Sequence, residues 1–445
     1  MTPTELSAAA AARALRDGAL TSEELVTACL ERIDAVDGDI EAWAHLDPEF
    51  ALTQARALDA SRQAGEPVGP LHGVPVGVKD IIDTEDLPTE NGTVLDAGRQ
   101  PRQDATVVSL LRQAGAVILG KTVSTELAVY GPGKTRNPHN PAHTPGGSSS
   151  GSAAAVAAYM TPLAVGTQTN GSVIRPAAYC GVVGFKPSHG LVPRTGILAQ
   201  SHWLDTVGVM ARSVEDAALL AEAIIAHDPG DPDTRPRARP RLSEISAEEP
   251  PLTPNLAFVK SSVWDHADAD ARDAFAELAD FLGDGCDEAE LPGPFGHAVE
   301  LHRKIMCADL AKSFAGYYER GKGKLTDTLR EMIEEGQKTL AVDYNRAVEW
   351  REVLNAGLGQ VFERYDAIIT PATAGVAPAG LESTGSPEFC TLWTYCGTPA
   401  VTLPLMEGGG GLPLGVQLVG PRGGDARLLR TARWLTDRVL RGDTA

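Results

Sequence analysis

The 445-residue sequence lacks several features that would place it in a functional class at once. It has only six cysteines, with no C-x-x-C pair and no zinc-site spacing, so neither a disulfide framework nor a zinc site is predicted. We expect buried free thiols in a reducing cytoplasm. Basic residues are outnumbered, with 39 Lys and Arg against 59 Asp and Glu. The net charge of −20 argues against nucleic acid or an anionic membrane surface as the main partner.

Long apolar runs are also missing. No stretch approaches eighteen consecutive apolar residues, so no membrane-spanning helix is predicted. The N-terminus carries Glu5 early and has only alanines where a secretory signal would have its apolar core, so no targeting segment is expected. Hydrophobic residues make up 43% of the chain and charged residues 22%, which is typical of a soluble globular protein. These features together predict a cytoplasmic protein with a large core.

The order of local patterns predicts one α/β domain over residues 1–445. Apolar runs typical of buried strands alternate with helical patterns, which indicates a mixed central sheet flanked by helices on both faces. The late runs "YDAIITP", "PAVTLPL" and "LPLGVQLVG" are expected to return to the same sheet. The domain has four parts: an N-terminal helical segment 1–66, a core 71–225, a Pro-rich excursion 229–254 and a mostly helical insert 267–364.

Local signals place several elements within these parts. Three helix starts are expected near the N-terminus, at the capping boxes Thr2–Glu5 and Thr21–Glu24 and at Asp47-Pro48. The runs "PVGVKD", "AVILGK" and "PLAVGT" predict buried strands. The segments "DATVVSLLRQAG" and "SGSAAAVAAYM" predict helices between those strands.

Two short motifs match known patterns but fail on their context. "GAVILGKT", residues 115–122, has the spacing of a phosphate-binding loop, yet its middle residues form a strand pattern that cannot wrap a phosphate. Lys121 is therefore interpreted as a strand-end lysine. "GSSSG", residues 147–151, has the spacing of a nucleophile elbow centred on Ser149. An elbow needs a strand before it, whereas the preceding segment has three prolines and no strand pattern.

The histidines give no metal site. No H-E-x-x-H occurs among the ten histidines, and the prolines beside His139 and His143 prevent the helix that would align these two rings. We interpret both as loop residues, and we expect neither a metal nor a cofactor.

One serine and one lysine remain as candidates for chemistry. Ser172 follows Thr169-Asn170-Gly171, a turn that can direct successive backbone N–H groups at one point and so form an oxyanion hole. Lys79 ends the apolar run "GVPVGVKD", where desolvation can remove its proton and leave a neutral base. In isolation the simpler interpretation of Lys79 is a strand-end lysine whose amine reaches solvent.

A resemblance connects these residues. "TPGGSSSGSAAAVAA" followed by "PLAVGTQTNGSVIRPAAYCGVVGFKPSHG" resembles the signature of the amidase signature family. The similarity extends more weakly over the chain, through "LHGVPVGVKD" and the late strands "CGTPAVTLP" and "LPLGVQLVG". It implies the amidase signature fold and a Ser–Ser–Lys triad in which one serine lies in a cis peptide bond.

The resemblance assigns roles by position. It implies that Lys79 is the base, Ser148 the bridging serine and Ser172 the nucleophile. It also implies that the backbone N–H groups of Thr169, Asn170, Gly171 and Ser172 form the oxyanion hole. The expected function is hydrolysis of a small-molecule carboxylic amide through an acyl-enzyme, with no metal, cofactor, nucleic acid or membrane involved. Whether the chain forms a homodimer stays open.

Two alternatives share the same fold. The first is an amidotransferase A-type subunit that passes ammonia to acyl-tRNA bound by partner subunits. The second is a catalytically silent scaffold, which would have no reason to keep a buried lysine. The sequence also departs from the family pattern at three positions, with Gln168 in place of Asp, Asn170 in place of Gly and Ser150 in place of Gly. We expect Arg175 to hold the loop through carbonyl groups or a carboxylate.

Overall fold

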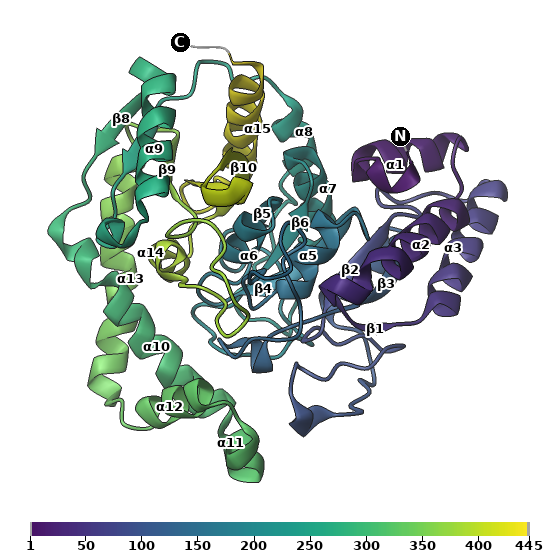
Figure 1. Ribbon diagram of the computed structural model, residues 1–445, viewed down its shortest axis with the longest axis horizontal. Coiled ribbons are helices and arrows are strands. Elements are labelled where there is room, and N and C mark those ends of the chain that lie inside the picture. The colour runs from purple at the N-terminus through teal and green to yellow at the C-terminus, as the bar shows by residue number, and fades with distance from the viewer. Residues whose placement is uncertain (1, 443–445) are drawn as a thin grey trace.

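A computed structural model describes residues 2–442 of the chain (Figure 1). Its centre is an 11-stranded sheet in the order β1-β3-β2-β4-β6-β5-β10-β11-β9-β7-β8. The strands are β1 (Trp43–Leu46), β2 (Pro75–Lys79), β3 (Val117–Thr122), β4 (Leu163–Gln168), β5 (Val183–Lys186), β6 (Thr206–Ala211), β7 (Leu256–Val259), β8 (Cys286–Ala289), β9 (Ala367–Pro371), β10 (Ala400–Glu407) and β11 (Pro413–Val419).

Helices fill the connections between these strands. They are α1 (Ala8–Asp17), α2 (Ser22–Ile40), α3 (Pro48–Gln63), α4 (Thr106–Gln113), α5 (Ser150–Ala157), α6 (Ile174–Tyr179), α7 (Val214–Ile224), α8 (Leu242–Ala247), α9 (Ala269–Leu282), α10 (Ala298–Ser313), α11 (Ala315–Gly321), α12 (Asp327–Gly336), α13 (Ala341–Phe362), α14 (Glu388–Cys396) and α15 (Asp425–Arg441).

The sheet is mixed, and its parallel part positions the candidate site. β2 pairs in parallel with β3 on one side and with β4 on the other. The carboxyl ends of β2 and β4 therefore lie next to each other on the same side of the sheet, and Lys79 and Gln168 are the last residues of these strands. Further along the sheet, β6, β5, β10, β11 and β9 pair antiparallel, each to the next. The expected α/β fold, a mixed sheet with helices on its faces, is confirmed.

The sheet is close-packed because its central strands are apolar on both faces. Every residue of β2, β3, β4 and β6 is buried. The predicted strands in "PVGVKD", "AVILGK" and "PLAVGT" are all present, as are the helices α4 and α5 and the three late strands. The expected second and third helix starts are also present, since Thr21 and Asp47 cap α2 and α3.

The structure corrects the sequence interpretation in several places. The first capping box leads only into a short 3-10 turn at Pro3–Glu5, and α1 begins later with Ser7 as its N-cap. The N-terminal helical segment also contains β1, a four-residue strand that pairs antiparallel with β3. The helical insert contains β8, an edge strand whose two central residues, Asp287 and Glu288, are charged and exposed. The Pro-rich excursion holds α8, with Leu242 fully buried.

All six cysteines are free thiols, and five of them are buried. Within residues 2–442, no helix combines the length and apolar character needed to cross a membrane.

Candidate active site

Lys79 ends β2 inside the sheet and is fully buried. Its Nζ lies 2.7 Å from Ser148 Oγ and 3.0 Å from Thr167 Oγ1. Burial lowers the pKa of Lys79 well below the usual lysine value. The carboxylate of Asp205 opposes this shift, and the guanidinium of Arg175 adds to it. Burial therefore favours the neutral amine of Lys79, whose hydrogen-bond partners are two hydroxyl groups.

Ser148 lies just before α5, and the peptide bond Gly147–Ser148 is cis. The loop is held by Arg175, whose Nη2 donates to the Gly147 carbonyl at 2.6 Å and whose Nη1 donates to the Gly385 carbonyl. Arg175 is only 1% exposed. Of the two partner types expected for Arg175, the structure shows carbonyl groups.

The residues Thr169–Ser172 connect β4 to α6, and all four of their carbonyl groups accept a hydrogen bond. Because a trans peptide unit is planar, a carbonyl held in one direction points the N–H of the next residue in the opposite direction. The four donors belong to α10, α14, α6 and the residue before α5: His302 Nε2 to Thr169 O, Thr394 Oγ1 to Asn170 O, Arg175 N to Gly171 O and Ser149 N to Ser172 O.

The backbone N–H groups of the same four residues, in contrast to their carbonyl groups, have no hydrogen-bond partner among the described residues. The loop therefore presents a row of free backbone donors, as an oxyanion site requires. His302 contributes as a neutral ring, because burial lowers the pKa of this residue to about 4.

Side chains of the loop are anchored as firmly as its backbone. Thr169 Oγ1 donates to Asp205 Oδ1 at 2.6 Å. The carboxamide of Asn170 donates to Tyr130 OH at 3.0 Å and accepts from Thr391 Oγ1 at 2.7 Å. Asn170, a departure from the family pattern, therefore packs its side chain against α14.

Ser172 is 8% exposed and adjoins the other two candidates. Its carbonyl accepts from the N–H of Ser149, the residue after Ser148, at 3.3 Å. Among residues 2–442, no hydrogen bond joins Ser148 Oγ to Ser172 Oγ. The structure thus brings Lys79 and Ser148 into direct contact, and it joins the backbone of Ser172 to that of Ser149, the residue after Ser148.

The lysine and the serine of the two rejected motifs are both bound to other parts of the protein. Lys121 is buried in β3, where its Nζ donates to Ile82 O at 2.8 Å and lies 3.6 Å from Asp80. Ser149 Oγ accepts from Thr167 N and bonds to Thr167 O, both at 3.2 Å, so it is engaged by the backbone of β4.

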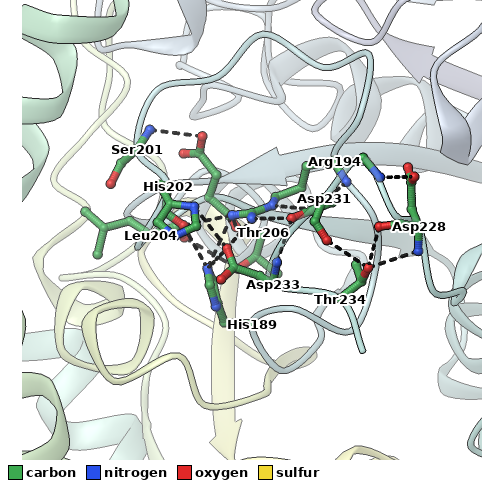
Figure 2. Close-up of polar contacts among 12 residues, drawn as sticks. His189, Arg194, Ser201, His202, Leu204, Thr206, Asp228, Asp231, Asp233 and Thr234 are labelled. Carbon is green, nitrogen blue, oxygen red and sulfur yellow. Dashed lines mark hydrogen bonds and ion pairs between the residues drawn. The ribbon is translucent and has the colours of Figure 1, made fainter. Parts of the chain in front are cut away.

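A cavity of about 420 Å³ borders the loop on the side of Thr167 and Thr169. Its wall is held by Arg194, which pairs with Asp231 at 2.7 Å and also with Asp233 (Figure 2). Asp205 lines the same cavity, and burial raises the pKa of its carboxyl group.

Sequence reasoning missed several of the residues that build this site, namely Thr167, Asp205, His302, Thr391 and Thr394. Each is an ordinary polar residue in its local sequence. All except Thr167 lie more than 30 positions from the loop they contact. Of these five residues, only Thr167 could have been suspected from the sequence, because it is adjacent to Gln168 in the signature segment.

Comparison with known proteins places the chain in a family. The sequence pattern described as Amidase matches residues 24–429. The chain belongs to the amidase family.

Its relatives differ in their stated roles. The A-type subunit of glutamyl-tRNA(Gln) amidotransferase from Salinispora arenicola is 36% identical over 98% of both chains. Native peptide amidase from Stenotrophomonas maltophilia is 31% identical with a TM-score of 0.86, covering 98% of this chain and 97% of that one. A third similar structure is described as an unexpected vestigial protein complex that reveals the evolutionary origins of an s-triazine catabolic enzyme. It is 28% identical with a TM-score of 0.90, and the match covers 97% of this chain and 98% of that one.

Proposed function

We propose that this amidase-family chain hydrolyses a small-molecule carboxylic amide through an acyl-enzyme on Ser172. The observation that carries the proposal is the 2.7 Å contact between Lys79 and Ser148, together with the loop 169–172, whose four N–H groups have no acceptor among residues 2–442. A base, a proton bridge and an oxyanion site are the parts that a serine nucleophile needs.

The first half of the reaction forms the acyl-enzyme. Ser172 Oγ attacks the amide carbon while its proton passes to Ser148 Oγ, whose own proton passes to the neutral amine of Lys79. The negative charge on the carbonyl oxygen is stabilised by N–H groups of residues 169–172, each donor being worth about 2.7–4 kcal/mol in comparable sites. The C–N bond then breaks, and the amine leaves with the proton returned from Lys79 through Ser148.

The second half uses water as the acceptor. Water attacks the ester carbon of Ser172 and gives its proton to Lys79 through Ser148. The tetrahedral species collapses to the carboxylic acid, and Ser172 Oγ regains its proton. Lys79 begins and ends the cycle neutral, which agrees with the direction in which burial shifts its pKa.

One rival needs a test of its own, because a relative of this chain is the A-type subunit of an amidotransferase. A subunit of that kind would share the site but deliver ammonia to acyl-tRNA bound by partner subunits. The excess of acidic over basic residues favours the free hydrolase, since a tRNA-docking face needs positive charge. A silent scaffold is disfavoured because Lys79 is fully buried and contacts no carboxylate within the described part of the chain, so it brings no structural benefit.

The test is a panel of small amides incubated with the isolated protein, scored by release of ammonia or amine. A fluorophosphonate should label Ser172, as located by peptide mass mapping, and Ser172→Ala should abolish both label and turnover. Labelling of Ser149 instead would refute the assignment. Turnover that appears only when acyl-tRNA is supplied together with partner subunits would establish the amidotransferase alternative.

A further inference from the structure

Gln168 occupies a position where the family pattern has Asp, and its side chain is 1% exposed. Its Oε1 accepts from the backbone N–H groups of Val173 and Ile174, at 2.8 and 2.9 Å. These are the two residues that follow Ser172. Since two donors face this atom, it must be the oxygen of the carboxamide, and the nitrogen must point the other way.

The side-chain nitrogen of Gln168 is linked through Thr394 to the carbonyl of Asn170. This Nε2 atom donates to Thr394 Oγ1 at 2.9 Å, and the Thr394 hydroxyl donates to the carbonyl of Asn170. Thr394 belongs to α14 and is 1% exposed. A hydroxyl group has one hydrogen, so Thr394 can hold the Asn170 carbonyl only if its other partner is a donor.

This requirement explains why an amide fits here and a carboxylate does not. A carboxylate at position 168 could still accept from Val173 and Ile174, but it could give nothing to Thr394. The single hydrogen of Thr394 would then be shared between two acceptors, and the Asn170 carbonyl would lose its partner. The peptide unit that carries this carbonyl also carries the Gly171 N–H, so that donor would lose its fixed direction.

We infer that Gln168 is a positioning residue, which through Thr394 aims the Gly171 N–H at the reacting carbonyl and does so without adding a negative charge beside the site. The inference deepens the proposed hydrolysis and rests on it. Asn170, the second departure, extends the same contact, because Thr391 of α14 holds its side chain. The two departures therefore form one neutral attachment of the loop to α14.

The absence of charge matters for Lys79. The charged groups that act on it are the Asp205 carboxylate, which favours its protonated form, and the Arg175 guanidinium, which disfavours it. His302 next to the loop is neutral at pH 7. A carboxylate at position 168 would add to the effect of Asp205 and raise the pKa of Lys79, so the acid limb of the activity profile would move to higher pH.

The experiment compares Gln168→Met, Thr394→Val, their combination and Thr394→Ser with the parent chain. We expect Gln168→Met and Thr394→Val each to lower kcat about tenfold with little change in KM, because the lost contact aims a transition-state donor. The double variant should be no slower than the slower single variant, since both interrupt one connection. Thr394→Ser keeps the hydroxyl and should restore kcat.

Gln417→Met is the matched control. Gln417 is fully buried, and its Nε2 donates to Phe389 O of α14 and to Pro371 O, both at 3.1 Å. It ties the same helix to the sheet without touching the loop. Its replacement should lower the melting temperature but leave kcat close to that of the parent chain.

The outcomes distinguish failure of the proposed function from failure of this inference. If the parent chain showed neither labelling of Ser172 nor turnover, both the proposed function and this inference would be refuted. Labelled Ser172 with parental kcat in Gln168→Met or Thr394→Val would overturn the inference alone, as would additive losses or a Thr394→Ser as slow as Thr394→Val. Gln168→Glu should move the acid limb upward, and an unmoved limb would refute the role of the missing charge.

Discussion

Two neighbouring strands of the sheet each bury a lysine, and only one lysine has surroundings suited to catalysis. Lys79 on β2 and Lys121 on β3 are both fully buried, and their strands pair in parallel. Lys121 faces the Ile82 carbonyl, the Thr89 hydroxyl and the carboxylate of Asp80. Lys79 faces the hydroxyl groups of Ser148 and Thr167 and no carbonyl or carboxylate within hydrogen-bond distance among residues 2–442.

The difference lies in what each set of partners allows. Carbonyl and carboxylate oxygens can only accept, and the negative charge of Asp80 favours the protonated form of Lys121. Hydroxyl groups can either accept from an ammonium or donate to a neutral amine, so Lys79 can lose its proton without leaving a partner unsatisfied. Burial lowers the pKa of Lys121 to about 8, and it lowers that of Lys79 well below the usual range. Burial alone therefore does not suit a lysine to the role of base; the hydroxyl partners of Lys79 are what suit it to the role we propose.

The largest expected effect comes from removing Lys79, the proposed base. Lys79→Ala should lower kcat by about 10³-fold or more, because the members of a catalytic unit fail together. The fold should persist, since no buried charge is left without a partner. Steady-state amide hydrolysis and circular dichroism measure the two quantities. Near-parental activity at pH 7 would remove Lys79 from the mechanism.

The neighbouring lysine should show the reverse pattern. Lys121→Met leaves Asp80, which is 2% exposed, without its cation, and breaking a buried pair typically costs about 3–5 kcal/mol of the free energy of unfolding. The fraction that remains folded should hydrolyse amides with parental kcat. Urea unfolding measures the loss, and Lys121→Met with Asp80→Asn should recover part of it. A folded Lys121→Met protein without activity would contradict the contrast between the two lysines.

The ends of β2 and β3 also show how far sequence reasoning reaches. Both strands follow from continuous apolar runs, which are typical of strands buried on both faces, and both lysines could be placed at the ends of those runs. Which lysine has hydroxyl partners could not be derived locally, since Ser148 and Thr167 lie 69 and 88 positions from Lys79. The resemblance supplied Ser148, whereas nothing in the sequence supplied Thr394, His302 or Asp205. The strand β8 was missed because it is only four residues long and its two central residues, Asp287 and Glu288, are charged and exposed, which leaves no apolar run.

A change of charge near Lys79 should move the pH dependence of activity. The Asp205 carboxylate favours protonated Lys79, so Asp205→Asn should lower the pKa of Lys79. In the proposed mechanism activity needs the neutral amine of Lys79, so the acid limb of the pH profile of kcat/KM should move to lower pH, by about one unit or less. Asp309→Asn is the control, because Asp309 lines the same cavity but bonds to Ser201 and Tyr344. Equal shifts in both variants would show a general field effect in place of a specific one.

The smallest effect tests the second hydroxyl partner of Lys79. Thr167 Oγ1 lies 3.0 Å from Lys79 Nζ and can donate to the amine once it is neutral. Thr167→Val keeps the shape and removes that hydroxyl, so Lys79 loses one of two partners and its amine can turn away from Ser148. We expect kcat to fall by about three- to tenfold, in line with about 0.5–1.5 kcal/mol for one hydrogen bond. Thr167→Ser should restore kcat. If the kcat of Thr167→Val equalled that of the parent chain at every pH of the acid limb, Ser148 alone would orient Lys79. The difference between Lys79 and Lys121 would then rest on the hydroxyl group of Ser148 only.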